Sequence, residues 1–289
     1  GDRIAFPTGR GRGRARIMTW TRTFALLAIL GGVLIGLAGL SNRPVLRSES
    51  ARPDAPRLAR RGNDTPSLTA ASALIQRLRN GEVLYERNAD VSLPIASLTK
   101  LMTALLFTEE ADSIESILFS AGATLAGRPD DKRSLVPAGE RLKAEDVLAL
   151  MLSASDSDAA FAAAEHVARR QQPELETAPF GERIAAFVGL MGRRAGALDL
   201  AGTHYGNPSG SEESENISTA RDLMRLAGYI TSVRPELWAA SRLREGFAFG
   251  AGGRRYSFVN TNPLLGEFPA MYGSKTGFNN SARGALLLR

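Results

Sequence analysis

Ser97 and Lys100 are the first residues whose types and spacing could do chemistry on a carbonyl group. They stand three positions apart in Ser97-Leu98-Thr99-Lys100. Residues three apart share a helix face, so the serine hydroxyl can lie within hydrogen-bond reach of the amine. A serine in a first helical turn also has its backbone N–H near the positive end of the helix dipole, which suits a developing oxyanion. The pair alone is equally typical of a helix cap followed by a solvated lysine.

Two other short segments carry polar side chains, one in a break between expected helices and one on an expected strand. Ser155 and Ser157 lie in a short polar break, 153–158, between two alanine- and leucine-rich stretches. Lys275 lies in Gly273-Ser274-Lys275-Thr276-Gly277, on an expected strand that glycines leave uncrowded. Taken alone, the first segment is an ordinary turn between helices, and the second is a strand that ends in a glycine turn.

Lysine is rare in this chain, which makes its positions informative. The sequence has lysine only at 100, 132, 143 and 275, and the remaining 32 of its 36 basic residues are arginines. A desolvated ammonium can lose its proton near neutral pH, whereas a guanidinium cannot. Lys100 and Lys275 are therefore candidates for acid–base chemistry.

The elements that must position these residues follow from the spacing of apolar side chains. Helical spacing covers 97–108, 144–152, 158–169, 180–197 and 219–230, the last opened by a Thr219-x-x-Asp222 capping box. Strand-like character covers 71–75, 83–85, 255–259, 270–275 and 285–288. Asn80-Gly81 predicts a type I′ hairpin turn between the first two strands, because that turn needs two positive φ angles. The order predicts an α+β fold with an antiparallel sheet shared by distant parts of the chain, helices that flank it, and a helical subdomain.

Composition excludes several classes of site. The chain has no cysteine, so it has no disulfide, thiol nucleophile or cysteine–zinc site, and we expect no metal and no cofactor. The residues next to His166 and His204 do not suggest a catalytic role, and no G-x-S-x-G segment occurs. Both observations disfavour a Ser-His-Asp hydrolase. Much of the net charge of +6 belongs to five arginines within residues 1–16. The rest of the chain has no basic, aromatic-interleaved stretch typical of nucleic-acid binding.

The amino-terminal part predicts export. Residues 24–40 form an uncharged, mostly apolar run that suits a signal-anchor or a cleaved signal peptide, and we favour the anchor. Arginines dominate the charge of residues 1–23, so the positive-inside rule makes this segment a cytoplasmic flank and directs the later residues outside. The proline- and arginine-rich stretch 41–66 reads as a linker. We expect a folded domain at 67–289, on the outer side of the membrane.

Read together, the three chemical segments match S-x-x-K, S-D-N and K-T-G in order, the signature of penicillin-binding proteins and class A β-lactamases. The chain resembles the D-alanyl-D-alanine carboxypeptidase family of low-molecular-weight penicillin-binding proteins from about Leu68 to Arg289. Further familiar stretches are 81–85, 207–210 and 260–265, which read GEVLY, NPSG and NTNPLL.

The resemblance implies an acyl-enzyme mechanism on peptidoglycan stem peptides, and a place in the bacterial cell envelope on the periplasmic face of the membrane. By this resemblance Ser97 is the nucleophile, Lys100 is its base and Ser155 relays a proton to the leaving amine. Lys275 and Thr276 hold the terminal carboxylate, and the backbone N–H groups of Ser97 and Phe278 form the oxyanion hole. The remaining residues expected to bind substrate are Ser157 and Gly277. β-Lactam antibiotics are expected to acylate the same serine.

The chain departs from the family pattern at two places. Ser157 stands where the family usually has asparagine, and a hydroxyl lacks the separate donor and acceptor of an amide, so we expect weaker substrate positioning. The sequence stops at Arg289, so the fold is expected to lack its last strands and carboxy-terminal helix.

Three alternatives to a carboxypeptidase stay open at this point. A DD-endopeptidase would use the same site on peptidoglycan cross-links. A β-lactamase would need a second base, and the stretch 172–176 follows Ser155 too closely to supply it. A non-catalytic wall-binding protein on the same fold is the third.

Overall fold

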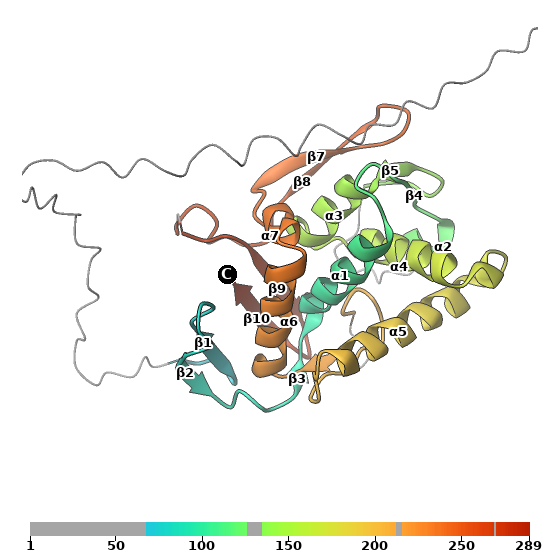
Figure 1. The fold of residues 1–289 in the computed structure, drawn as a ribbon. Helices are drawn as coiled ribbons and strands as arrows, with labels where there is room; N and C mark the ends of the chain where they lie inside the picture. The colour runs from blue at the N-terminus through green and yellow to red at the C-terminus, as the bar shows by residue number, and fades with distance from the viewer. Residues whose placement is uncertain (1–67, 126–134, 212–215, 269) are drawn as a thin grey trace, which may run out of the picture. The chain divides into compact units, whose positions relative to one another are not determined.

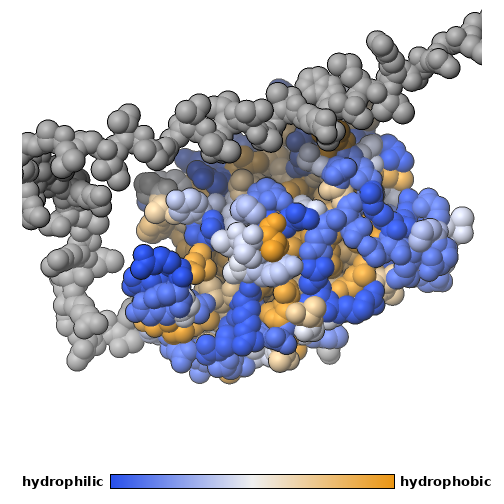
Figure 2. All heavy atoms as spheres, viewed as in Figure 1, coloured by the Kyte–Doolittle hydropathy of each residue, from blue (hydrophilic) through white to orange (hydrophobic). Residues whose placement is uncertain are grey.

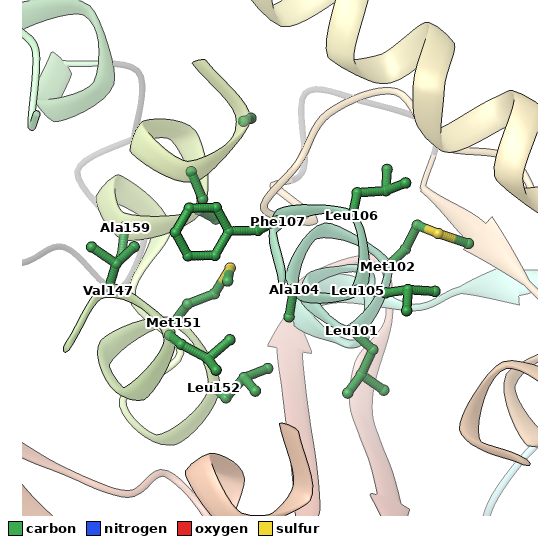
Figure 3. Close-up of a cluster of buried hydrophobic side chains, with 14 of the residues drawn as sticks. Leu101, Met102, Ala104, Leu105, Leu106, Phe107, Val147, Met151, Leu152 and Ala159 are labelled. Carbon is green, nitrogen blue, oxygen red and sulfur yellow. The ribbon is translucent and has the colours of Figure 1, made fainter. Parts of the chain in front are cut away.

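Helix α1 (Lys100–Glu110) lies at the centre of the hydrophobic core. Every residue from Lys100 to Phe107 is buried, so the helix is covered on all sides. Figure 3 shows side chains of α1, Phe107 among them, facing Val147, Met151 and Leu152 of a neighbouring helix. A helix without a solvent face must be enclosed by other elements. The residues at its amino end are thereby held in a rigid frame.

The computed structural model describes residues 68–125, 135–211, 216–268 and 270–289. These residues belong to a compact unit that runs from Pro66 to Arg289. The expected flank, membrane segment and linker, at 1–23, 24–40 and 41–66, lie outside the described residues. Among the helices that the structure describes, none combines the length and the apolar character that crossing a membrane requires. Hydrophilic side chains cover most of the face of this unit seen in Figure 2.

Helices α3, α4 and α5 pack against α1 (Figure 1), and their bounds are given with those of the other helices below. The expected helix 180–197 is found with the same bounds, and Thr219 caps the next helix by accepting a hydrogen bond from the backbone N–H of Asp222. In the described part of the chain the helical elements are η1 (Ala96–Thr99), α2 (Ala121–Leu125), α3 (Ala144–Ser153), α4 (Ser157–Gln171), η2 (Pro173–Leu175), α5 (Phe180–Ala197), α6 (Ala220–Val233) and α7 (Glu236–Ser241).

The strands form antiparallel pairs. The pairs are β1 (Ala73–Gln76) with β2 (Val83–Arg87), β3 (Leu93–Pro94) with β6 (Ile217–Ser218), β4 (Ser116–Leu118) with β5 (Arg141–Lys143), β7 (Glu245–Phe249) with β8 (Arg255–Val259), and β9 (Ser274–Asn279) with β10 (Arg283–Leu288). The α+β class is confirmed. Distant parts of the chain share a sheet where β3 pairs with β6. The expected joining of the first hairpin with the carboxy-terminal strands is not found among the described residues, where β1 pairs only with β2 and β9 only with β10.

The predicted type I′ turn at Asn80-Gly81 is wrong. Only Gly81 has a positive φ, of 71°, whereas that turn needs two such residues. Arg77 and Glu82 close the loop instead, since the N–H of Arg77 donates to the carbonyl of Glu82 at 2.8 Å. The hairpin therefore has a longer loop.

Candidate active site

The nucleophile candidate Ser97 lies in the 3-10 turn η1, immediately before α1. Its predecessor Ala96 has a φ of 45°, which is strained for a residue with a side chain. Lys100 is the first residue of α1 and is fully buried. Its Nζ hydrogen-bonds to Ser97 Oγ at 3.0 Å. The tight turn and the helix start thus bring the two side chains of the Ser-x-x-Lys segment together.

Lys100 Nζ has two further hydrogen-bond partners. The backbone carbonyl of Ser209 accepts from it at 2.7 Å, and Ser157 Oγ lies at 3.4 Å. Ser157 is thus the most distant of the three partners. A distance of 3.4 Å is long for a hydrogen bond, so the contact with Ser157 is weak.

Ser155 lies on the turn that joins α3 to α4. Its φ of 61° places it in the left-handed region. The flanking residues hold this conformation, because Asp156 Oδ1 caps α4 by accepting from the N–H of Ala159 at 2.8 Å, and Ser153 Oγ donates to the carbonyl of Ala240 at 2.6 Å. The polar break expected from the sequence is therefore a constrained turn that projects Ser155.

Strand β9 brings the third segment to the same place. Lys275 is 1% exposed, and its Nζ donates to Ser155 Oγ at 2.9 Å and to the carbonyl of Thr276 at 2.8 Å. Gly277 allows β9 to pass close to the nucleophile turn, because a Cβ there would lie 2.9 Å from the carbonyl oxygen of Ile95. Phe278 is 75% exposed at the edge of the site.

Burial disfavours the charged form of Lys275. Desolvation first, and the charge of Lys100 second, hold the pKa of Lys275 well below its ordinary value of 10.5. Its Nζ lies within hydrogen-bond distance of Ser155 Oγ, so the two groups are close enough for proton transfer.

These segments enclose a cleft of about 360 Å³. Most of its lining residues are serines and threonines, with Lys100 and Lys275 buried behind them. The lining residues are Ser97, Ser155, Ser157, Ser209, Gly210, Ser211, Thr261, Thr276, Gly277, Phe278 and Asn279. A wall of hydroxyls can donate to and accept from a peptide backbone along its length.

Every residue that the sequence pointed to is at or behind this cleft. Sequence reasoning did not assign Ser209, Ser211, Thr261 or Asn279 to the site. The stretches NPSG and NTNPLL, which contain Ser209 and Thr261, contribute to the family resemblance. Nothing in their residue types indicates contact with the nucleophile.

The other lysines and the histidines take no part in this cleft. Lys143 is exposed and pairs with Glu145 at 3.6 Å, and Lys132 lies outside the described residues. His166 faces Glu115 at 3.3 Å, and the backbone of His204 bridges to Ile217. Within the described part of the chain, no group of histidine, aspartate and glutamate side chains could hold a metal ion.

Comparison with protein families gives the same assignment as the three segments. The family described as D-alanyl-D-alanine carboxypeptidase matches residues 59–289. The chain belongs to this family. Members of the family carry the penicillin-binding fold, and the chain shares that fold with a mutant DD-transpeptidase of Streptomyces. That structure has a TM-score of 0.67 and 22% identity, with 78% of this chain and 86% of that one covered.

Named relatives of this D-alanyl-D-alanine carboxypeptidase family member fall into two groups. A D-alanyl-D-alanine endopeptidase of Pseudomonas aeruginosa is 33% identical, over 77% of this chain and 67% of its own length. A D-alanyl-D-alanine carboxypeptidase of Bacillus subtilis is 27% identical, over 89% of this chain and 61% of its own length. The chain thus spans about two thirds of the length of these relatives.

Proposed function

We propose that this chain is a serine DD-peptidase that hydrolyses the D-alanyl-D-alanine end of peptidoglycan stem peptides as a carboxypeptidase, through an acyl-enzyme on Ser97. One observation carries the proposal. Each of two buried lysines is hydrogen-bonded to a serine, Lys100 to Ser97 and Lys275 to Ser155, and both serines line one cleft. Family membership supports the D-alanyl-D-alanine substrate.

Acylation begins at Ser97. A neutral Lys100 amine has two N–H bonds and one lone pair, and the lone pair can take the hydroxyl proton of Ser97. Ser97 Oγ then bonds to the carbonyl carbon between the two D-alanines. The backbone N–H groups of Ser97 and Phe278, two residues that line the cleft, would stabilise the oxyanion.

The leaving amine needs a proton when the carbon–nitrogen bond breaks. Ser155 supplies it from its hydroxyl, and Lys275, 2.9 Å away, can return a proton to Ser155. Water then adds to the acyl carbonyl and gives one proton, through Ser155, to Lys275, which lost a proton during acylation. The ester bond to Ser97 breaks, and Lys100 returns the proton that it took to Ser97 Oγ. The reaction balances without a metal or organic cofactor.

The terminal carboxylate of the substrate would bind at Lys275 and Thr276. An anion beside Lys275 favours its charged form, which opposes the lowering of its pKa by burial. Thr261 Oγ1 is hydrogen-bonded to Thr276 Oγ1 and lines the same wall, so a second hydroxyl is available to the carboxylate. Ser157, Gly277 and Phe278 would border the peptide as it enters.

Acylation by a penicillin tests the enzymatic proposal directly. Intact mass spectrometry should show one penicillin adduct on the wild-type chain and on Ser113→Ala, which removes an exposed serine hydroxyl away from the cleft. Ser97→Ala should show no adduct. A folded wild-type chain that takes up no penicillin would overturn the proposal and favour a non-catalytic wall-binding protein.

Cleavage of peptidoglycan cross-links is a second candidate activity. It is favoured by the relative with 33% identity, which carries the name D-alanyl-D-alanine endopeptidase. Digestion of defined muropeptides separates the two activities: a carboxypeptidase releases D-alanine from monomers, and an endopeptidase converts dimers into monomers. Rapid turnover of a chromogenic cephalosporin would instead support a β-lactamase.

Peptidoglycan lies outside the cytoplasmic membrane, so we place the domain in the cell envelope, on the extracytoplasmic side. We propose residues 24–40 as the segment that exports or holds it there. A fusion of residues 1–66 to a reporter that is active only after export should be active. A deletion of 24–40 should abolish that activity.

A further inference from the structure

The hydrogen bond between Lys100 and the carbonyl of Ser209 has a consequence for the direction of the Lys100 lone pair. A carbonyl oxygen can only accept, so one N–H of Lys100 must point at Ser209. In a neutral amine this leaves one N–H and one lone pair for Ser97 and Ser157. If Ser157 takes the second N–H, the lone pair faces Ser97. The Ser209 carbonyl thereby rules out the orientation of the amine in which the lone pair faces Ser209.

The position of that carbonyl depends on the side chain of Asn207. Asn207 Oδ1 accepts from the N–H of Ser209 at 2.9 Å and from the N–H of Gly210 at 2.7 Å. It also accepts from Asn216 Nδ2 at 3.1 Å and from Ser209 Oγ at 3.3 Å. One buried oxygen therefore gathers four donors and fixes the backbone of residues 207–210, which we call the Asn207 turn.

The Asn207 turn packs directly on the nucleophile and on α1. The carbonyl of Pro208 accepts from Thr103 Oγ1 at 2.7 Å, one helical turn beyond the contact of Ser209 with Lys100. Gly210 has a φ of 84°, and a Cβ there would lie 2.0 Å from the carbonyl oxygen of Ala96. Two consecutive carbonyls of the turn thus accept from one face of α1, and the glycine that follows lies against the residue before Ser97.

We propose that Asn207 is a positioning residue for the acylation step, which acts through the Ser209 carbonyl to aim the Lys100 lone pair at Ser97. This inference rests on the proposed function, because it assigns Asn207 to the same reaction. Asn207 itself does not touch the substrate. Its Nδ2 donates to Ser211 Oγ of the cleft wall at 2.5 Å. Its loss should therefore release one wall hydroxyl, but it should slow proton removal from Ser97 far more than it weakens the initial binding of a β-lactam.

Stopped-flow acylation of the full chain by a chromogenic cephalosporin tests the proposal. Asn207→Leu should lower the acylation rate constant about 10- to 100-fold, less than the roughly 100- to 10,000-fold that a general base contributes, because Lys100 is misdirected and not removed. The dissociation constant of the initial complex should change less than about threefold, and the final stoichiometry should stay at one adduct per chain. Asn207→Asp keeps an acceptor oxygen for the turn and should recover most of the rate. Asn80→Leu, in the exposed hairpin loop, should acylate like the wild type.

A merely structural role for Asn207 gives a different result. It would lower the adduct stoichiometry and the melting temperature together, with the surviving fraction reacting at the wild-type rate, and that outcome overturns the proposal. If Asn207→Leu does not fold, Thr103→Val decides the question, because it removes another bond that holds the same turn and should also slow acylation. Wild-type rates in Thr103→Val would then overturn the inference, whereas absence of acylation in the wild-type chain would overturn the proposed function itself.

Discussion

Substitution of Gly210 by alanine should damage both stability and acylation, and the size of the effect follows from the structure. An alanine Cβ at this position would lie 2.0 Å from the carbonyl oxygen of Ala96 and 3.0 Å from the backbone nitrogen of Ser97. Relief of this overlap needs a movement of roughly 1 Å and costs about 1–3 kcal/mol. The φ of 84° costs an alanine about another 1–2 kcal/mol. We therefore expect a loss of about 2–5 kcal/mol in the free energy of unfolding.

Two assays measure these effects. Thermal unfolding should show a melting temperature lower by about 5–20 °C for a domain of this size. Acylation by a chromogenic cephalosporin should slow by about 100-fold or more, because a displacement of about 1 Å at a reacting group has that effect. The matched control is Gly252→Ala, where a Cβ meets nothing within 4 Å and stability should change by less than about 0.5 kcal/mol. If Gly210→Ala matches the wild type in melting temperature and acylation rate, the Asn207 turn does not pack on Ser97 as described.

Three further predictions concern the cleft and its supports. Because burial holds the pKa of Lys275 well below 10.5, the unfolded chain binds more protons between the two pKa values. The free energy of unfolding should therefore rise with pH toward 10.5, and Lys275→Met should flatten that rise in urea titrations from pH 7 to 10. Ser157→Asn should speed acylation about 3- to 10-fold, since an amide reaches closer to Lys100 than the present 3.4 Å; an unchanged or slower rate would contradict this reasoning. Asp156→Ala removes the cap of α4 and should cost about 1–2 kcal/mol in urea unfolding, and a loss below 0.3 kcal/mol would show that the cap is dispensable.

Local patterns in the sequence predicted the elements whose stability is local. Helix α5 has the expected bounds Phe180–Ala197 because its amphipathic spacing is carried by the segment itself. The capping box at Thr219 also needs only neighbouring residues. Strand β9 begins at Ser274 and runs to Asn279, later than the expected 270–275, because its polar and glycine residues give no apolar alternation.

Features that depend on distant contacts could not be predicted in this way. Lys100 and Ser209 are 109 positions apart, and no periodicity links the Asn207 turn to the nucleophile. The hairpin loop at Asn80 differs from the expected turn because a closing pair between Arg77 and Glu82 sets its length. Three short segments in order identified the reacting groups, whereas the residues that orient those groups emerged only from the packing of the chain.

The unequal burial of the lysines has a practical consequence for chemical labelling. Of the three lysines in the described part of the chain, Lys100 and Lys275 are enclosed, while the side chain of Lys143 is 58% exposed. An amine-reactive dye attacks an accessible neutral amine, so it should modify Lys143 and spare the two lysines of the cleft. A fluorophore or surface linker could thus be attached through amine chemistry to a protein that still reacts with penicillin.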